Sequence, residues 1–390
     1  MPVRSMKLLT FTEIFPTQEH LTAGIFVGKL VEALAALCEV EVIVPQPWSP
    51  FARRERVFTR CENYRGIPVY KPRLFVLPRG DRLSFRGLPF LFAALALLIR
   101  KKKWDFHLIH AHMAAPAGFA GVLLGKLLRK PVVITVHGSD IHTYPQYPLL
   151  GKMVRFSLKH ADKVVAVSQA LASQALALGV SQEQLAVVYN GVDLQLFQRL
   201  DREAMQRRLG LTGQQVLLFV GLLISRKAPS HLLQAFKTLV NSHSNLLLVI
   251  IGEGELEGKL REQCQRDGIE KRVWFVGTRP HEELPCWMGA ADLLCLPSLH
   301  EGLPQVVLEA LACGLPVVAT AVDGTPEAIR DDTVGLLVPP GDPEQLARAL
   351  REALSRVWDR EAIAEYGKRF SWRETAEHYM MVFESLCNSI

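Results

Sequence analysis

The sequence predicts an α/β protein of two domains, each a doubly wound parallel sheet, and two observations carry this prediction. Short apolar, β-branched segments alternate with helical patterns along most of the chain, as expected for parallel strands covered by helices on both faces. A polar and charged stretch at 196–214, which contains no strand pattern, divides these segments into two runs. The length of 390 residues also exceeds what one ordinary core holds.

The first run supplies the strands of an N-terminal domain, which we place at 1–197. The strand patterns are KLLTFTEI, EVEVIVP, FHLIHAH, PVVITVHG, KVVAVS and LAVVYNGVD, with helical patterns near 24–37, 116–128 and 148–160. We interpret 196–214 as the linker plus a short helix.

The second run supplies a second sheet, in a domain that we place at 198–370. Its strand patterns are VLLFVG, NLLLVIIGEG, VWFVG, LLCLPS, PVVATAV and VGLLVP, with helices near 229–241, 255–266, 281–290, 304–313, 325–330 and 343–357. Ligands of open parallel sheets bind beyond the carboxyl ends of the strands, so two such domains face to face would form one cleft. A last helical pattern, SWRETAEHYMMVFESL within 371–390, follows the finished sheet.

Composition and cysteine usage indicate a globular protein of the cytoplasm. Apolar residues make up 49% and charged residues 22%, which excludes a disordered or fibrous chain. The N-terminal segment MPVRSMKLLTFTEIF lacks the apolar core of a signal peptide and predicts a first strand instead. The 7 cysteines form no C-x-x-C pair, which favours reduced thiols over a disulfide framework.

Charge is distributed unevenly between the two halves. Residues 1–200 carry 25 Lys+Arg against 13 Asp+Glu, a net +12, whereas residues 201–390 carry 20 against 26, a net −6. The basic half is either a solvated face or a surface that meets an anionic partner, such as a membrane or a phosphate-bearing lipid. We expect no nucleic-acid partner.

The segment 88–103, LPFLFAALALLIRKKK, also has two interpretations. Its apolar run is shorter than the ~20 residues that span a bilayer, so we favour a buried core helix. An interfacial membrane helix is the alternative, and the trailing Lys101, Lys102 and Lys103 are its support.

Two glutamates flank a turn and a helix start in HEGLPQVVLE, residues 300–309. Gly302 gives backbone freedom, Pro304 suits the first helical turn, and Gly314 ends the helix. A helix that begins at the carboxyl end of a strand points free N–H groups at an anion. Glu301, in the loop, and Glu309, roughly 7.5 Å along the axis from Pro304, would both face one elongated ligand. From spacing alone, a capping residue and a surface glutamate explain the pair as well.

These residues resemble the signature of the family 4 retaining glycosyltransferases, which have the GT-B fold. The block E-G-L-P-x-V-x-L-E-A-L-A-C-G-L-P-V-V-A-T is the most specific match, and the resemblance covers essentially the whole chain. Further matching positions are Gly24-Ile25-Phe26, Val136-His137-Gly138, Asn190-Gly191-Val192-Asp193 with Phe197, Val220-Gly221, Lys227, Gly252-Glu253-Gly254 and Phe370-Ser371-Trp372.

The resemblance implies two Rossmann-like domains, with a nucleotide-sugar donor held mainly by the second, an acceptor by the first, and a terminal helix that returns to the first. It implies a catalytic set of three residues. His137 would reach the donor sugar, Lys227 would meet the diphosphate, and Glu301 would lie near the sugar. Leaving-group charge is the main barrier in breaking a glycosyl–phosphate bond, so a cation and a helix N-terminus fit that chemistry.

Further donor contacts follow from the same resemblance. Glu309 would bind the ribose hydroxyls, and the backbone N–H groups of Gly302 and Leu303 would bind the sugar or the diphosphate. The remaining expected donor-binding positions are Gly24, Leu222, Gly252, Gly254 and Gly277. Asp140 and Asn190 are candidates for contact with the acceptor or the sugar.

One position departs from the family pattern, which usually has an arginine directly after the glycine of VG. Here that residue is Leu222, and Arg226 is the nearby candidate to supply the charge. His110 and His112 alternate on one face of FHLIHAH, a spacing that would suit a metal. Since no acidic or cysteine residue accompanies them, we expect core histidines and no metal site.

The expected function is that of a retaining, metal-independent hexosyltransferase without a cofactor. Its donor would be a UDP- or GDP-sugar, and its acceptor a glycan, a lipid-linked or a small molecule in polysaccharide or glycolipid synthesis. We expect it in the cytoplasm, peripheral on the inner membrane face. Two alternatives stay open: a binding subunit whose GT-B site has decayed, which Leu222 would support, and a GT-B nucleotide-sugar epimerase.

Overall fold

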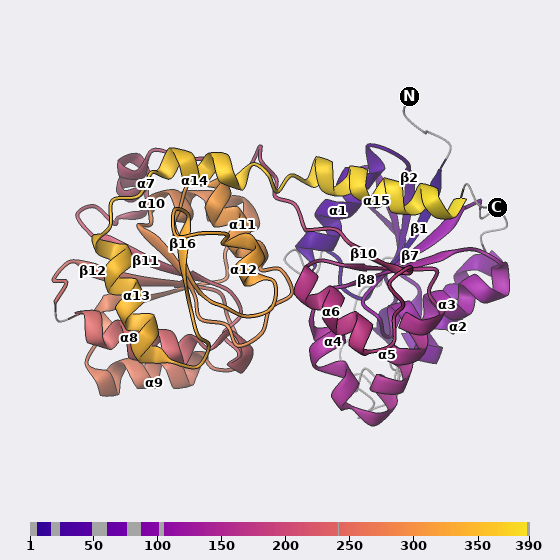
Figure 1. Cartoon of the computed structure of the whole chain (residues 1–390), viewed down its shortest axis with the longest axis horizontal. Helices are drawn as coiled ribbons and strands as arrows, with labels where there is room; N and C mark the ends of the chain where they lie inside the picture. The colour runs from indigo at the N-terminus through magenta and orange to yellow at the C-terminus, as the bar shows by residue number, and fades with distance from the viewer. Residues whose placement is uncertain are drawn as a thin grey trace. The chain divides into compact units, whose positions relative to one another are not determined.

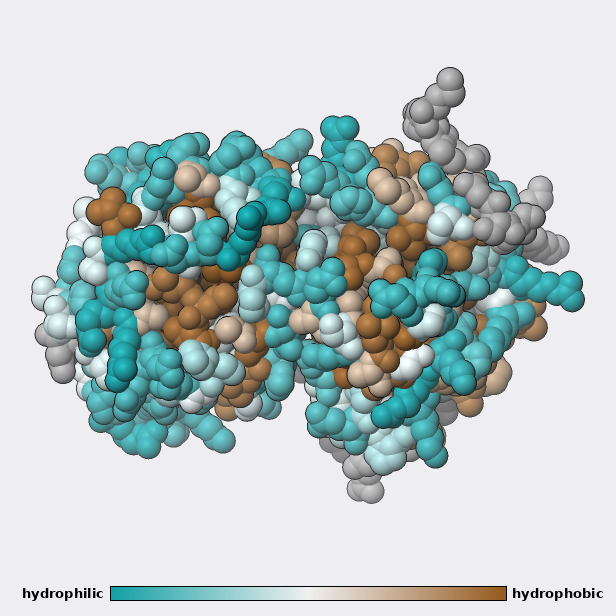
Figure 2. Space-filling view, in the orientation of Figure 1, coloured by the Kyte–Doolittle hydropathy of each residue, from teal (hydrophilic) through white to brown (hydrophobic). Residues whose placement is uncertain are grey.

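The computed structural model describes residues 6–16, 24–48, 61–75, 87–100, 105–240 and 242–387, and the chain folds as two compact units (Figure 1). Unit 1 comprises Met1–Asn190 with Trp372–Ile390, and unit 2 comprises Gly191–Ser371. On the face drawn in Figure 2, hydrophilic side chains on each unit are interrupted by apolar patches.

Unit 1 is built on an 8-stranded sheet with the order β10-β9-β8-β7-β1-β2-β5-β4, parallel except for the antiparallel pair β4 and β5. Its strands are β1 (Lys7–Phe11), β2 (Glu39–Ile43), β4 (Cys61–Tyr64), β5 (Ile67–Tyr70), β7 (Leu108–His112), β8 (Val132–Val136), β9 (Lys163–Ala166) and β10 (Leu185–Val187). A separate parallel pair consists of β3 (Gln46–Trp48) and β6 (Arg73–Phe75). Strand β8 is buried along its whole length, which suits its β-branched sequence VVITV. Strand β7 is equally buried, although it carries His110 and His112.

The helices of unit 1 cover this sheet. They are α1 (Ile25–Ala35), α2 (Gly87–Arg100), α3 (Ala117–Leu128), α4 (Ser139–His142), the short 3₁₀ helix η2 (Tyr144–Gln146), α5 (Pro148–His160), α6 (Gln169–Ala177) and α15 (Trp372–Cys387). The C-terminal helix α15 packs beside α1 (Figure 1). It contributes Trp372, Tyr379 and Phe383 to the apolar core that α1 and the sheet also form. The last helix of the chain is thus part of the first unit.

Helix α2 is apolar on both faces but only one face is buried. Phe90 and Ala94 are buried against the unit, whereas Leu88 is 53% and Phe92 is 64% exposed. The expectation of a buried core helix therefore holds for one face of this segment only, and the lysines at 101–103 lie outside the described residues. Within the described part of the chain, no helix is long and apolar enough to cross a bilayer.

Unit 2 is built on a 6-stranded, all-parallel sheet with the order β13-β12-β11-β14-β15-β16. Its strands are β11 (Gln215–Val220), β12 (Leu246–Ile251), β13 (Val273–Gly277), β14 (Leu293–Leu296), β15 (Val317–Thr320) and β16 (Gly335–Val338). Its helices are α7 (Arg202–Leu209), α8 (Pro229–Val240), α9 (Glu257–Asp267), α10 (Leu284–Ala290), α11 (Gln305–Ala312), α12 (Thr325–Ala328), α13 (Pro343–Ser355) and α14 (Arg360–Gly367). Short 3₁₀ helices are η3 (Ser225–Lys227), η4 (Glu270–Arg272) and η5 (His281–Glu283).

The predicted fold class is confirmed, since both units are α/β with parallel sheets and every strand predicted for the two runs is present. The β4–β5 hairpin was not predicted. Its turn residues Arg65 and Gly66 both have positive φ, the conformation of a two-residue hairpin turn. The strand order of each sheet reverses once: between β1 and β7 in unit 1, and between β11 and β14 in unit 2. Such reversal points are where open parallel sheets bind ligands.

Candidate active site

Lys227 and Glu301 meet at the reversal point of the second sheet. Lys227 ends η3, in the connection that follows β11, and Glu301 lies in the loop that follows β14. Lys227 Nζ lies 2.5 Å from Glu301 Oε1, and the side chains are 15% and 6% exposed. Two residues 74 positions apart are thereby joined in an almost buried ion pair.

The Glu301 carboxylate is held in place by further contacts. Ser298 Oγ donates to the same Oε1 atom at 2.6 Å, and the backbone N–H of Glu301 donates to Asp323 Oδ2 at 2.8 Å. The carbonyl of Ser298 in turn accepts from Thr320 Oγ1 at 2.5 Å. The carboxylate is bound by two side chains, Lys227 and Ser298, and Asp323 and Thr320 bind the backbone of its loop. It therefore has little freedom to rotate away, and the loop presents it in one orientation.

Gly302 and Leu303 follow Glu301 in this loop and are both buried. The carbonyl of Gly302 accepts from the N–H of Gly324 at 3.1 Å. Among the hydrogen bonds of the described residues, none uses the N–H of Gly302 or Leu303 as a donor. Buried amides without acceptors are rare in proteins, so these two N–H groups are available to an anionic ligand.

Glu309 is buried within α11, where it accepts a hydrogen bond from an unpredicted partner. His281 Nε2, from η5, lies 2.8 Å from Glu309 Oε1, and the Phe197 ring packs against the histidine at 5.0 Å. The family signature had drawn attention to Glu309 alone. No sequence pattern pointed to His281, which lies four residues after the end of β13.

Three predicted glycines meet at the carboxyl ends of β12 and β13. The N–H of Gly252 donates to the carbonyl of Gly277 at 3.0 Å. A Cβ atom on Gly252 would lie 2.0 Å from the carbonyl oxygen of Gly221, and one on Gly254 would lie 2.4 Å from that of Leu223. These glycines therefore allow the loop at 252–254 to pack on the loop that leads to Lys227.

Leu222 is 55% exposed, so its side chain contributes no buried packing. Arg226 lies nearer the loop of Glu301: its guanidinium donates to the carbonyl of His300 at 3.4 Å, and its own carbonyl accepts from Leu299 at 2.8 Å. A cation is thus present next to the predicted phosphate contacts, although position 222 is apolar.

In unit 1, His137 follows β8 and is half-buried. Its Nε2 lies 3.0 Å from Nδ1 of His112, and the Phe26 ring packs on it at 4.8 Å. Burial lowers the pKa of His137 to about 3, so the imidazole is neutral at physiological pH.

Asp140 holds the backbone on which His137 sits. Its Oδ1 accepts from the N–H groups of His137 and Gly138, and its Oδ2 accepts from that of Ala114, each at 3.0 Å. Burial raises the pKa of this carboxyl, while the three N–H groups act in the opposite direction. Asp140 is completely buried, and its hydrogen bonds join the two loops that follow β7 and β8.

Gly24 and Asn190 are the remaining predicted positions of unit 1. Gly24 has φ 66° at the start of α1, and a Cβ there would lie 2.6 Å from the carbonyl oxygen of Ile14, so glycine is required. Asn190 is buried, with 7% of its surface exposed.

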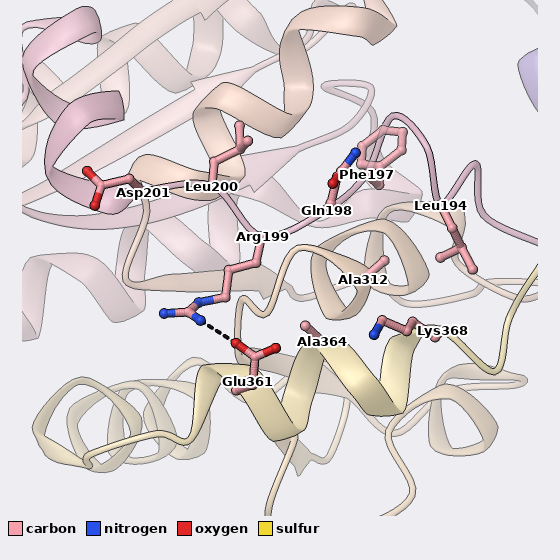
Figure 3. Close-up of a pocket in the computed structure, with 10 residues that line it drawn as sticks. All are labelled: Leu194, Phe197, Gln198, Arg199, Leu200, Asp201, Ala312, Glu361, Ala364 and Lys368. Carbon is pink, nitrogen blue, oxygen red and sulfur yellow. Dashed lines mark hydrogen bonds and ion pairs between the residues drawn. The ribbon is translucent and has the colours of Figure 1, made fainter.

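A cavity of about 540 Å³ in unit 2 is lined by none of the predicted catalytic, donor-binding or acceptor-contact residues (Figure 3). An ion pair between Arg199 and Glu361 crosses it, and Lys368 lies on its other side (Figure 3). Its lining residues are Leu194, Phe197, Gln198, Arg199, Leu200, Asp201, Ala312, Glu361, Ala364 and Lys368.

Comparison with known proteins identifies the family. Residues 23–196 match the family described as Glycosyltransferase Family 4, and residues 201–370 match Glycosyl transferases group 1. TuaC of Bacillus subtilis (strain 168), named as a glycosyltransferase of teichuronic acid biosynthesis, is 32% identical over 369 residues, which cover 90% of each chain.

Solved structures share the fold over nearly the whole chain. A sucrose-phosphate synthase from Thermosynechococcus elongatus is 21% identical with a TM-score of 0.82, covering 98% of this chain and 100% of the other. HepE of Anabaena, solved in complex with UDP-glucose, is 22% identical with a TM-score of 0.74 and the same coverage. Because both halves of the chain match these families and the similarity to TuaC extends over 90% of each chain, the chain belongs to the family 4 glycosyltransferases and has the GT-B fold.

Proposed function

We propose that this glycosyltransferase is a retaining, metal-independent enzyme that moves a sugar from a UDP- or GDP-sugar to a glycan, lipid-linked or small-molecule acceptor in the cytoplasm. The observation that carries the proposal is the buried Lys227–Glu301 pair next to the unused N–H groups of Gly302 and Leu303. A cation and free amides suit a diphosphate, and a fixed carboxylate suits sugar hydroxyls. The UDP-glucose bound to HepE supports the donor class, and the name of TuaC supports a polysaccharide acceptor.

In the proposed reaction, the bond between the anomeric carbon and the diphosphate oxygen breaks, and the acceptor hydroxyl oxygen bonds to that carbon. The hydroxyl proton passes to the departing diphosphate. Lys227 and the amides of Gly302 and Leu303 stabilise the charge that develops on the leaving group. Retention requires attack from the face that the leaving group vacates, and no carboxylate is assigned as a covalent nucleophile.

The ion pair also explains how the site stays stable before the donor arrives. An isolated buried charge is costly, so Lys227 and Glu301 satisfy each other in the free protein. A bound donor would give Lys227 a phosphate partner and Glu301 a sugar hydroxyl. Glu309, oriented by His281, would accept from the ribose hydroxyls.

A second candidate is a binding subunit with a decayed site, and exposed Leu222 in place of the family arginine favours it. The intact Lys227–Glu301 pair, its Ser298 support and the neighbouring Arg226 count against it. A nucleotide-sugar epimerase is the third candidate, with no structural observation of its own in support.

A thermal-shift screen with UDP, GDP and ADP tests the proposal. A nucleotide present at 100 times its Kd stabilises the folded protein by about 2.7 kcal/mol, which raises the Tm by roughly 5–10 °C for a unit of this size. The nucleotide that binds then selects the sugar donors to assay, with product configuration determined by NMR. Binding without transfer to any acceptor would favour the decayed subunit, and epimerised donor in the absence of acceptor would favour the epimerase.

We further propose that α2 contacts an anionic membrane surface. Leu88, Phe92 and Ala96 recur every four residues and are all exposed, so they form an apolar stripe on the solvent face of the helix. Helix α3, which packs against α2, ends with exposed Leu127 and Leu128. Because residues 1–200 carry a net +12, basic groups would reinforce apolar insertion into anionic lipid.

Replacing Leu88 and Phe92 together by serine is expected to weaken binding to phosphatidylserine vesicles roughly a hundredfold or more, because each lost side chain removes about 1.5–3 kcal/mol of burial. Cosedimentation at low salt measures this. Val357→Ser in unit 2 is the control, since Val357 is 95% exposed but lies outside the proposed surface. Equal vesicle binding by the wild type, the double variant and the control would disprove membrane contact through α2.

A further inference from the structure

Three histidines and a threonine form a buried polar cluster on one face of the first sheet. His110 and His112 alternate along β7, and Thr135 is the register partner of His112 on β8, with His137 two residues further on. Because side chains alternate between the faces of a strand, all four lie on the same face. His110, His112 and Thr135 are completely buried.

The cluster contains two sets of hydrogen bonds. His110 Nε2 lies 2.8 Å from Thr135 Oγ1, which lies 3.1 Å from the hydroxyl of Tyr379 on α15. His112 Nδ1 lies 3.0 Å from His137 Nε2, and the two rings stack at 5.3 Å with an interplanar angle of 19°. His112 therefore contacts His137 directly, whereas His110 is joined to the terminal helix.

All three imidazoles are neutral. Burial lowers the pKa of His110 and His137 to about 3 and that of His112 well below its usual value. A neutral imidazole has one N–H donor and one bare nitrogen acceptor. The bond between His112 and His137 consequently fixes two tautomers at once.

The burial of His112 decides which of the two histidines donates this hydrogen bond. Its Nε2 is buried and has no hydrogen-bond partner among the described residues. If His137 donated to His112, this Nε2 would carry a hydrogen with no acceptor. If His112 donates, Nε2 is only a bare acceptor. Orphaned buried N–H groups are rarer than orphaned acceptors, so His112 is the donor.

We propose that His112 is a positioning residue, whose Nδ1–H donates to Nε2 of His137 and thereby holds His137 with its proton on Nδ1. Nδ1 of His137 forms no hydrogen bond with any other described residue. His137 thus presents an N–H donor, which binds an oxygen lone pair of a sugar or phosphate, rather than a bare nitrogen. This consequence rests on the proposed function, in which His137 contacts the donor.

Histidine ¹⁵N NMR of the full chain without ligand tests the tautomer directly, with the His137 signals assigned by their loss in His137→Gln. In the wild type we expect protonated Nδ1 and bare Nε2 on His137. In His112→Leu, which cannot donate, we expect the proton of His137 to move to Nε2. A wild-type His137 protonated on Nε2 overturns the proposal, and so does an unchanged tautomer in His112→Leu.

A matched set of variants tests the consequence for turnover. His112→Asn places an amide N–H where Nδ1 stood, His112→Leu removes the donor, and His110→Gln keeps an N–H for Thr135 without touching His137. With UDP-glucose as the probe, we expect kcat to fall about 10- to 100-fold in His112→Leu, with partial rescue in His112→Asn and little change in His110→Gln. A Tm measurement on each variant shows that it is folded.

The two assays separate the two proposals. If the wild type releases no UDP from UDP-glucose, this sugar nucleotide is not its donor, but the NMR experiment still decides the tautomer. If the wild type is active, equal losses of kcat in His112→Leu and His112→Asn would show that His112 acts only through packing. That result would overturn its role as a positioning residue.

Discussion

Replacing Lys227 by methionine is expected to lower turnover about 100- to 1,000-fold, because the departing diphosphate loses its buried cation. The ammonium is the group nearest Glu301, at 2.5 Å, so the same change leaves that carboxylate without its ion-pair partner. Loss of one member of a buried pair destabilises by as much as about 3 kcal/mol, which would appear as a lower Tm. Steady-state kinetics and thermal unfolding measure the two effects.

A double variant separates catalysis from stability at this pair. In Lys227→Met with Glu301→Gln, no buried charge is left unpaired, and the amide oxygen of residue 301 still accepts from Ser298. We expect the Tm to recover relative to Lys227→Met alone while turnover stays low. Lys237→Met is the control, since Lys237 pairs with Asp267 at 2.7 Å on the surface of unit 2. Recovery of turnover in the double variant would mean that Lys227 serves stability alone.

Gly252→Ala is expected to destabilise unit 2 by at least about 3 kcal/mol and to abolish nucleotide binding. Gly252 has φ 134°, and its new Cβ would lie 2.0 Å from the carbonyl oxygen of Gly221. Since that oxygen belongs to the backbone, no side-chain rotation relieves the overlap. The loop that leads to Lys227 would have to move.

Gly268→Ala provides the matched control for this prediction. Gly268, which follows α9 and is outside the predicted site, also has positive φ, at 67°, but nothing lies within 4 Å of an added Cβ. We expect it to lose only about 1 kcal/mol, the ordinary cost of left-handed backbone for an L-residue, and to keep nucleotide affinity. Urea unfolding and calorimetry with UDP or GDP compare the variants. Equal destabilisation by both changes would show that the close approach of Gly252 to Gly221 has no energetic consequence.

Most of the fold could be predicted from the sequence because the inner strands of both sheets are buried on two faces. Burial on both faces gives continuous apolar runs such as PVVITV and LLLVII, and such runs can be recognised from a short segment of sequence. The exposure of α2 was not visible, because an apolar run has the same composition whether one face or both are covered. The β4–β5 hairpin was missed because its strands alternate weakly and its turn, Arg65-Gly66, has no asparagine or aspartate.

The residues of the candidate site could also be predicted only in part from the sequence. The family signature identified Glu301, Lys227 and Glu309 individually, but their contacts join residues far apart in sequence and appear only in three dimensions. His281 carried no signal of its own, and His112 was expected to be an ordinary core histidine. Asp140 was a candidate ligand contact, and its three backbone N–H partners give it a holding role that spacing cannot reveal.

The most direct test of the central claim, that the loop of Glu301 receives the donor diphosphate, is a crystal structure of the full chain with UDP or GDP. We predict that the phosphates accept hydrogen bonds from the N–H groups of Gly302 and Leu303, with Lys227 Nζ turned from Glu301 toward a phosphate oxygen. A diphosphate bound instead beside Arg199 and Lys368, in the cavity of Figure 3, would contradict the account.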